Sequence, residues 1–116
     1  MLPQQRFVRR FPRVRSEHPV RLRILGERRP EALSLTQVIG LGGCMLVSDR
    51  SIGFGSLMEL TISLEGRSMR ADGRVAWERR KGASEHEVGI EFLRLTRADR
   101  VALEQVVAAK IDSSAA

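Results

Sequence analysis

The sequence predicts an all-β (mainly β) fold, a six-stranded antiparallel β-barrel followed by one C-terminal α-helix. Six short segments alternate apolar and polar residues with the period of two that a half-buried strand shows. Turn residues separate these segments at close intervals, which favours hairpins and a small barrel. Only after Thr96 does the spacing of apolar residues become that of a helix.

The six expected strands are short, and each is bounded by Gly, Pro, Ser or charged residues. They cover residues 19–25, 31–39, 44–48, 57–64, 69–78 and 88–92. In the second of them Leu33 and Leu35 alternate with Ser34 and Thr36, and Glu65-Gly66 is typical of a tight hairpin turn.

A helix is expected after Thr96, because Thr96 and Asp99 have the spacing of a capping box. Leu103, Val106, Val107 and Ile111 then recur at helical spacing. The sequence thus divides into a basic N-terminal arm at 1–18, a barrel with its helix at 19–112, and a frayed tail at 113–116.

Composition indicates one globular domain of 116 residues, with 42% hydrophobic and 29% charged residues. The single cysteine, Cys44, excludes an intramolecular disulfide and is typical of a reducing cytoplasm. No signal peptide and no apolar segment of about 20 residues is visible. We therefore predict a cytoplasmic protein without a membrane span.

Positive charge is concentrated at the N-terminus. Residues 1–30 carry a net charge of +7, whereas residues 31–116 carry −1. Eighteen of the twenty basic residues are arginine, the side chain best suited to bidentate contact with phosphate or with a guanine edge. The segment Arg9-Arg10-Phe11-Pro12-Arg13 therefore indicates a clamp for an anionic ligand.

Catalysis and metal binding have little support in the sequence. His18 and His86 share no metal-ligand spacing with Cys44, and neither a Gly-x-Ser-x-Gly nor a Walker motif occurs. We predict a binding module that is not an enzyme and needs no cofactor or metal.

A second feature is the glycine-rich segment 38–46, "VIGLGGCML", where glycines interrupt an apolar strand. Glycine permits positive φ and close approach of a ligand or of another backbone, and exposed N–H groups in such a turn bind anions. The simpler interpretation is that a barrel needs a tight bend there.

Together these motifs resemble the PilZ domain family: Arg9 and Arg13 as Arg-x-x-x-Arg, a glycine turn ending at Gly43, "GRVAW" at 73–77 and "VGIEF" at 88–92. The resemblance covers roughly residues 6–110. It implies a six-stranded barrel and, in many members, binding of the bacterial second messenger cyclic di-GMP. The ligand-binding candidates are Arg9, Arg10, Arg13, Gly40, Gly42 and Gly43, with Arg6, Val38 and Trp77 as further candidates.

The second family motif, Asp/Asn-x-Ser-x-x-Gly, is degenerate in this chain. Aligning Gly43 places Val38 at the Asp/Asn position and Gly40 at the Ser position. A register shifted by one gives Gln37, Ile39 and Gly42, which restores an amide but breaks the glycine alignment. We prefer the first register. Trp77 shares an expected strand face with Met69 and Val75, which favours core packing over stacking on a guanine.

Three functions remain as alternatives. The first is a cyclic di-GMP receptor, in which the arm folds over the ligand at the barrel rim. The second is a divergent PilZ-like adaptor that docks a protein effector without nucleotide. The third is a small binder of single-stranded DNA or RNA, which the low aromatic content of 4% makes the least favoured.

Overall fold

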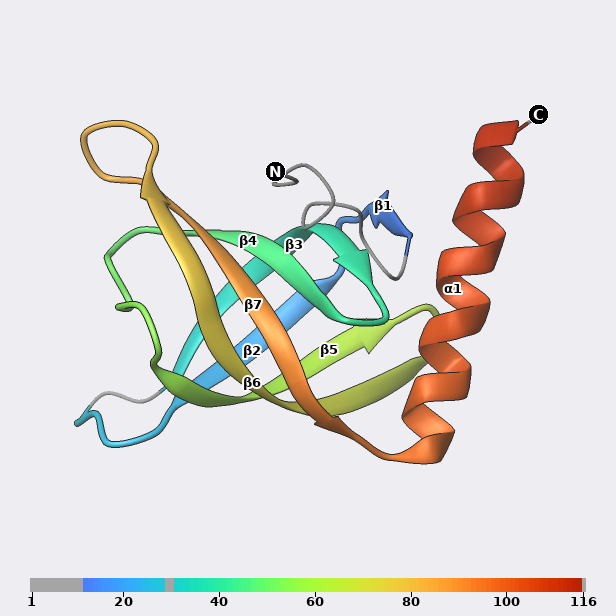
Figure 1. Ribbon diagram of the computed structural model, residues 1–116, viewed down its shortest axis with the longest axis horizontal. Helices are drawn as coiled ribbons and strands as arrows, with labels where there is room; N and C mark the ends of the chain where they lie inside the picture. Colours follow the sequence, from blue (N-terminus) through green and yellow to red (C-terminus); the bar gives the residue numbers. More distant parts are fainter. Residues whose placement is uncertain (1–11, 29–30, 116) are drawn as a thin grey trace, which may run out of the picture.

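The computed structural model describes residues 12–28 and 31–115 (Figure 1). Seven strands and one helix follow along these residues. They are β1 (Arg13–Arg15), β2 (Pro19–Ile24), β3 (Glu31–Gly40), β4 (Gly43–Ser48), β5 (Leu57–Leu64), β6 (Arg67–Arg80), β7 (His86–Leu95) and α1 (Arg97–Ala115).

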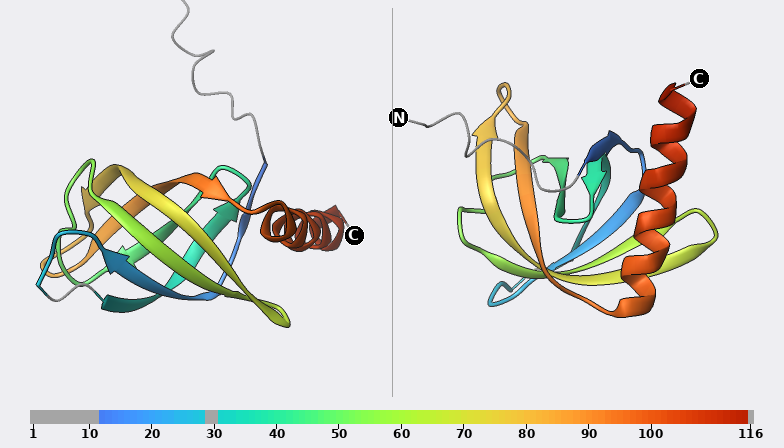
Figure 2. Two further views of the ribbon diagram at one scale, coloured as in Figure 1. Left: turned by 90° about the horizontal axis from the view of Figure 1, so that it is seen from below. Right: turned by 45° about the vertical axis from the view of Figure 1, so that its right-hand side comes forward.

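Six of the strands close into an antiparallel barrel. Their hydrogen-bonded order is β3-β2-β5-β6-β7-β4, and a further pairing between β3 and β4 completes the circle (Figure 2). The predicted six-stranded barrel with a C-terminal helix is confirmed.

β1 is an addition that the sequence did not reveal. The arm at 1–18 showed no strand pattern, yet Arg13–Arg15 pairs with the end of β3, in line with β2 along the same edge. The link between β1 and β2 stays close to β3, because Ser16 N–H donates to Gln37 O and Thr36 N–H donates to His18 O. The last residues of the arm are therefore part of the sheet, and the predicted boundary at residue 18 does not separate them from it.

The core fills the barrel and follows the predicted alternation on most strands. On β2, Val20, Leu22 and Ile24 are buried, and Arg21 and Arg23 between them are exposed. β5 has the same pattern, and its hairpin to β6 turns at Glu65-Gly66 as expected, with φ of +89° at Gly66.

β3 departs from this pattern. Leu33 and Leu35, which alternate with polar residues, point to solvent with 79% and 52% exposure, while Thr36 is fully buried. The pairing with β4 then jumps at Gln37, which has no partner on β4, and Ile39 takes the inward position. A β-bulge of this kind shifts the inward and outward faces of a strand by one residue.

Asp99 fixes the start of α1 to β6. Thr96 is the N-cap, since its hydroxyl accepts from the backbone N–H of Asp99 at 3.1 Å. The Asp99 carboxylate accepts from the Arg67 guanidinium at 2.6 Å and from the backbone N–H of Arg70 at 3.1 Å. Asp99 therefore joins helix to barrel.

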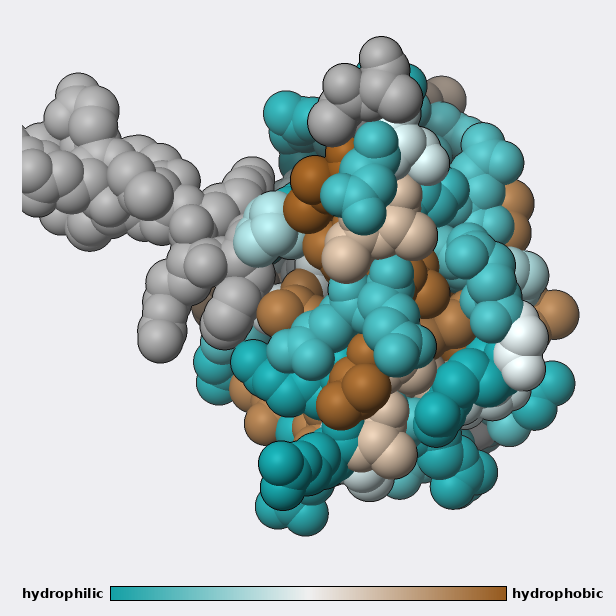
Figure 3. All heavy atoms as spheres, turned by 90° about the vertical axis from the view of Figure 1, so that its right-hand side faces the viewer, coloured by the Kyte–Doolittle hydropathy of each residue, from teal (hydrophilic) through white to brown (hydrophobic). Residues whose placement is uncertain are grey.

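α1 packs against one end of the barrel, where it contacts β1, β3, β5 and β6. It buries Ala102, Leu103, Val106 and Val107, whereas Ile111 is 39% exposed. The helix continues to Ala115, so residues 113–115 are helical where a frayed tail was expected. On this side of the molecule hydrophilic residues cover most of the surface, and hydrophobic ones show in patches between them (Figure 3).

Candidate functional site

The glycine turn joins β3 to β4 through Leu41 and Gly42. None of Gly40, Gly42 and Gly43 has the positive φ that the sequence suggested. Instead, neighbouring backbones approach closely: a Cβ on Gly40 would lie 2.7 Å from Pro12 O, and one on Gly43 would lie 2.1 Å from Ile90 O. Glycine is needed here for close packing of strands.

The pairing registers place Arg13, the last residue of the arginine motif, beside this turn. Arg13 on β1 pairs with Gly40, which pairs with Gly43, and that row continues to Glu91 and Arg74. The neighbouring row runs Arg15–Val38–Met45–Gly89–Trp77. We call the outer surface made by these two rows the glycine face, because three of its ten positions have no side chain.

Trp77 lies on the glycine face, so the expected core packing with Met69 and Val75 is wrong. The register between β6 and β7 jumps between Val75 and Trp77, and this bulge turns the indole outward, with 38% exposure. The ring covers Gly89, since a Cβ there would lie 2.1 Å from the indole Nε1. An indole that packs on backbone with one side open offers a surface for stacking.

A shallow hollow of about 730 Å³ opens over β1, β3 and β4 beside α1. Among the described residues that line it, Arg15 and Lys110 are cationic and Glu17 is the only acidic one. Its other lining residues are Ser16, Leu35, Thr36, Gln37, Val38 and Met45. This hollow shares Arg15, Val38 and Met45 with the glycine face.

A buried polar network, which no sequence motif indicated, holds the residues that follow β1. The Ser16 hydroxyl is hydrogen-bonded to His18 Nδ1 and to the Thr36 hydroxyl, which also accepts from the His18 N–H at 3.0 Å. His18 Nε2 lies 3.0 Å from Glu65 Oε2. These bonds explain why Thr36 points inward, and they fix the residues that follow β1 against β3.

The predicted site residues fall into two groups. Arg13, Val38, Gly40, Gly42, Gly43 and Trp77 lie together on the glycine face or in its turn, while Arg6, Arg9 and Arg10 lie outside the described residues. Cys44 lies beneath this surface. Burial raises the pKa of its thiol to about 12, against a smaller opposing effect of the nearby Arg13 charge. Cys44 is therefore a small buried side chain rather than a reactive thiol.

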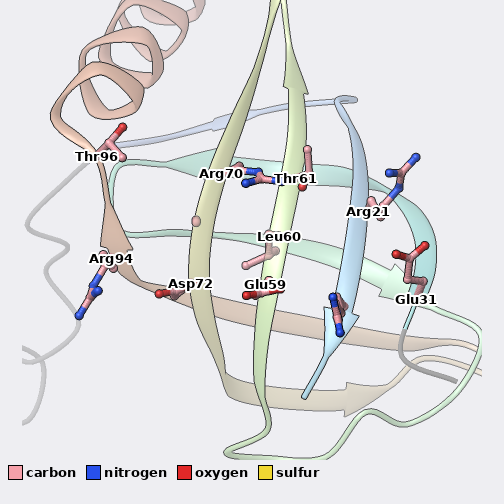
Figure 4. A pocket seen from close by; sticks show the side chains of 11 residues that line it. Arg21, Glu31, Glu59, Leu60, Thr61, Arg70, Asp72, Arg94 and Thr96 are labelled. Carbon is pink, nitrogen blue, oxygen red and sulfur yellow. The ribbon is translucent and has the colours of Figure 1, made fainter. Parts of the chain in front are cut away.

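A second hollow, of about 320 Å³, lies elsewhere on the barrel (Figure 4). We call the outer surface around it the charged face. Its exposed charged residues come from β2, β3, β5, β6 and β7, and four are cationic and three acidic: Arg21, Arg23, Arg70, Arg94, Glu31, Glu59 and Asp72.

Two further properties concern only the described residues. Within 12–28 and 31–115, no helix is long and apolar enough to cross a membrane. No group of three or more His, Cys, Asp or Glu in the same part of the chain is arranged to hold a metal ion.

Over residues 7–109 the sequence matches the family model of the PilZ domain. The chain belongs to the PilZ domain family. A search of curated proteins finds no match to this PilZ domain.

Solved structures agree with this assignment. The PilZ domain of Escherichia coli YcgR with c-di-GMP has a TM-score of 0.75 at 10% identity, over 92% of this chain and 94% of that chain. The K. pneumonia MrkH–c-di-GMP complex has a TM-score of 0.74 at 19% identity, over 91% of this chain and 53% of that chain. Bacillus subtilis MotI/DgrA, an inhibitor of motility, has a TM-score of 0.73 at 17% identity, over 90% of this chain and 52% of that chain. This PilZ domain spans about half the length of the last two, and at these identities the likeness establishes the fold.

Proposed function

We propose that this PilZ domain is a non-enzymatic receptor for cyclic di-GMP, and that its arginine arm closes over the dinucleotide on the glycine face. The observation that carries the proposal is the register of β1. It anchors one end of the Arg-x-x-x-Arg motif, Arg13, opposite Gly40 and Gly43. Membership of a family with c-di-GMP-bound structures supports the choice of ligand.

Each part of the face has a role in this proposal. Arg9, Arg10 and Arg13 pair with the two phosphates, as guanidinium groups do through charge-assisted bonds. Gly40 and Gly43 allow the backbones around Arg13 to pack closely, and Gly42 lies in the turn between them, so these glycines shape the base of the site. Trp77 stacks on a guanine, and Arg6 and Val38 make further contacts. Such a receptor for a soluble second messenger works in the cytoplasm.

The degenerate motif sets the expected affinity. Neither Val38 nor Gly40 can supply the side-chain hydrogen bonds of the family motif. Losing both costs on the order of 2–4 kcal/mol, or tens to several hundredfold in Kd. The additional guanidinium of Arg10 offsets part of this loss, because each bond between arginine and phosphate is charge-assisted.

Calorimetry with purified cyclic di-GMP tests the proposal. We expect heat of binding from the full chain. Arg13→Ala should raise the Kd about 10- to 150-fold, because it removes a charge-assisted contact worth about 1.5–3 kcal/mol. Arg23→Ala is the matched control, because it removes the same charge from the charged face and should leave Kd within about twofold. Absence of heat from the wild type up to about 1 mM ligand, which exceeds a micromolar Kd weakened several hundredfold, overturns the receptor function.

The second candidate is a PilZ-like adaptor that docks a protein effector without nucleotide. It is favoured by the exposed Leu33 and Leu35, which continue the apolar surface of Val38 and Met45 on β3 and β4. In a pull-down, such an adaptor recovers the same protein with and without cyclic di-GMP. The double substitution Leu33→Glu and Leu35→Glu abolishes this recovery. Recovery that depends strictly on the nucleotide contradicts it.

A further inference from the structure

Gln37 occupies an unusual position in the sheet. In a regular strand successive side chains point to opposite faces. At the bulge in β3, however, Gln37 has no partner on β4, and both Gln37 and Val38 line the hollow, between the fully buried Thr36 and Ile39. The bulge therefore presents an amide beside the motif position that Val38 occupies.

The Gln37 carboxamide is available for a ligand. Its backbone carbonyl accepts from Ser16 N–H, which fixes the main chain, while its side chain is exposed and has no hydrogen-bond partner among the described residues. Met45 and Val38 provide apolar contact next to it, and Arg15 and Lys110 provide positive charge in the same hollow. A polar group held by a fixed backbone and surrounded by apolar and cationic side chains suits a base attached to a phosphate.

We propose that Gln37 hydrogen-bonds the edge of one purine of the bound cyclic dinucleotide, in place of the Asp or Asn that the family motif has at the position of Val38. This inference rests on the proposed receptor function and adds a residue that determines base specificity.

The chemistry of the amide predicts which bases the site accepts. A carboxylate only accepts hydrogen bonds, so it matches the adjacent N–H donors on the guanine edge. A carboxamide both donates and accepts, and it therefore also matches the N6–H donor and N7 acceptor of adenine. We expect this PilZ domain to discriminate guanine from adenine less strongly than a site with a carboxylate in this place.

The experiment measures Kd for cyclic di-GMP and cyclic di-AMP by calorimetry on the full chain. Gln37→Ala should weaken cyclic di-GMP binding about 2- to 10-fold, as expected for one neutral hydrogen bond. Gln37→Glu should raise the preference for cyclic di-GMP over cyclic di-AMP about 10-fold or more, because the carboxylate has no donor for adenine. Glu59→Gln on the charged face changes a side chain outside the proposed site, so it is the control and should leave this preference within about twofold.

The outcomes separate this inference from the receptor function. If the wild type binds neither dinucleotide, the receptor function fails and this inference fails with it. If the wild type binds cyclic di-GMP and Gln37→Ala binds it equally well, or Gln37→Glu leaves the preference unchanged, only the role of Gln37 is overturned. Thermal melts show whether each variant is folded, so that Kd values are compared only between folded proteins.

Discussion

The glycine face and the charged face both carry arginines on the outside of one barrel, and they differ in what lies opposite those arginines. On the charged face, the row across β2, β5, β6 and β7 runs Arg23–Glu59–Asp72–Arg94, so each arginine has a carboxylate as its neighbour. On the glycine face, Arg13 is in register with Gly40 and Gly43, and only Arg74, at the far end of the same row, faces a carboxylate, that of Glu91 at 2.8 Å. Cross-strand neighbours interact directly, so the carboxylates partly neutralise the first group. An anion site therefore depends on what surrounds its arginines more than on their number.

The same comparison revises the interpretation of net charge. The excess of +7 in residues 1–30 indicated a single anionic ligand at the N-terminus. Arg21 and Arg23, however, belong to β2 and point onto the charged face. Only the arginines up to Arg15 precede β2 and belong to the proposed clamp.

The largest effect is expected from a substitution that disrupts the packing of the glycine face. In Gly43→Ala the new Cβ would lie 2.1 Å from the carbonyl oxygen of Ile90, and main-chain atoms cannot rotate away as a side chain can. We expect the free energy of unfolding to fall by about 3 kcal/mol, the upper part of the range for overpacking. Urea denaturation measures this. Glu59→Ala on the charged face is the control and should change the free energy of unfolding by less than about 0.5 kcal/mol. Equal effects of the two variants contradict the packing role of Gly43.

A smaller effect is expected where the indole of Trp77 is moved but kept. In Gly89→Ala the new Cβ overlaps only the Trp77 ring among its nearest atoms, so the ring must shift. If the ring stacks on a base, both Gly89→Ala and Trp77→Ala should weaken cyclic di-GMP binding by about 1–3 kcal/mol, or 5- to 150-fold. Calorimetry measures the loss. Binding that survives both changes excludes stacking.

The third prediction concerns pH and the loop between β4 and β5, which is hydrogen-bonded to Glu78. Burial by itself raises the pKa of Glu78, but hydrogen bonds from Gly53 N–H, the Ser51 hydroxyl and Ile52 N–H, together with His86 nearby, outweigh burial and hold the pKa below its ordinary value of 4.5. A depressed pKa stabilises the fold above the unfolded pKa, and this stability is lost as pH falls through the folded pKa.

The free energy of unfolding should therefore decline below about pH 4.5, as denaturant titrations at several pH values will show. Glu78→Gln keeps an acceptor oxygen but cannot titrate, so it should flatten part of this decline. Glu59→Gln on the charged face is the control for the loss of one carboxylate, because no described residue donates a hydrogen bond to Glu59. Identical pH profiles for wild type and Glu78→Gln would refute the role of Glu78.

The smallest effect is expected at Cys44, directly beneath the glycine face. Cys44 is 2% exposed and the pKa of its thiol is raised to about 12, so iodoacetamide at pH 8 should leave it unmodified in the folded protein and label it after unfolding. Mass spectrometry reads the modification. Rapid labelling under native conditions shows that β4 opens, and that the glycine face is less rigid than its packing indicates.

The sequence predicted those parts of the fold in which alternation and turn chemistry agree. β2 and the β5–β6 hairpin have apolar residues at every second position and a Glu-Gly turn, so strand, face and turn were all predicted. The helix start was predicted because Thr96 and the periodic apolar residues mark it.

The sequence could not show the bulges or β1. An extra residue in one strand inverts the faces beyond it, and alternation is equally consistent with either face. This is why Trp77 was expected in the core and why the outward position of Val38 beside Gln37 was not foreseen. β1 has only three residues, too few for a pattern, and its pairing depends on the polar network of Ser16, His18 and Thr36.

The measurement that most directly tests the central claim is a ¹H–¹⁵N correlation spectrum of the full chain, recorded as cyclic di-GMP is added. If the dinucleotide binds to the glycine face, the amide signals of Gln37, Gly40, Gly43 and Gly89 and the indole N–H of Trp77 shift, while those of Arg23, Glu59 and Asp72 stay in place. Shifts confined to the charged face, or none at all at saturating ligand, would contradict the account.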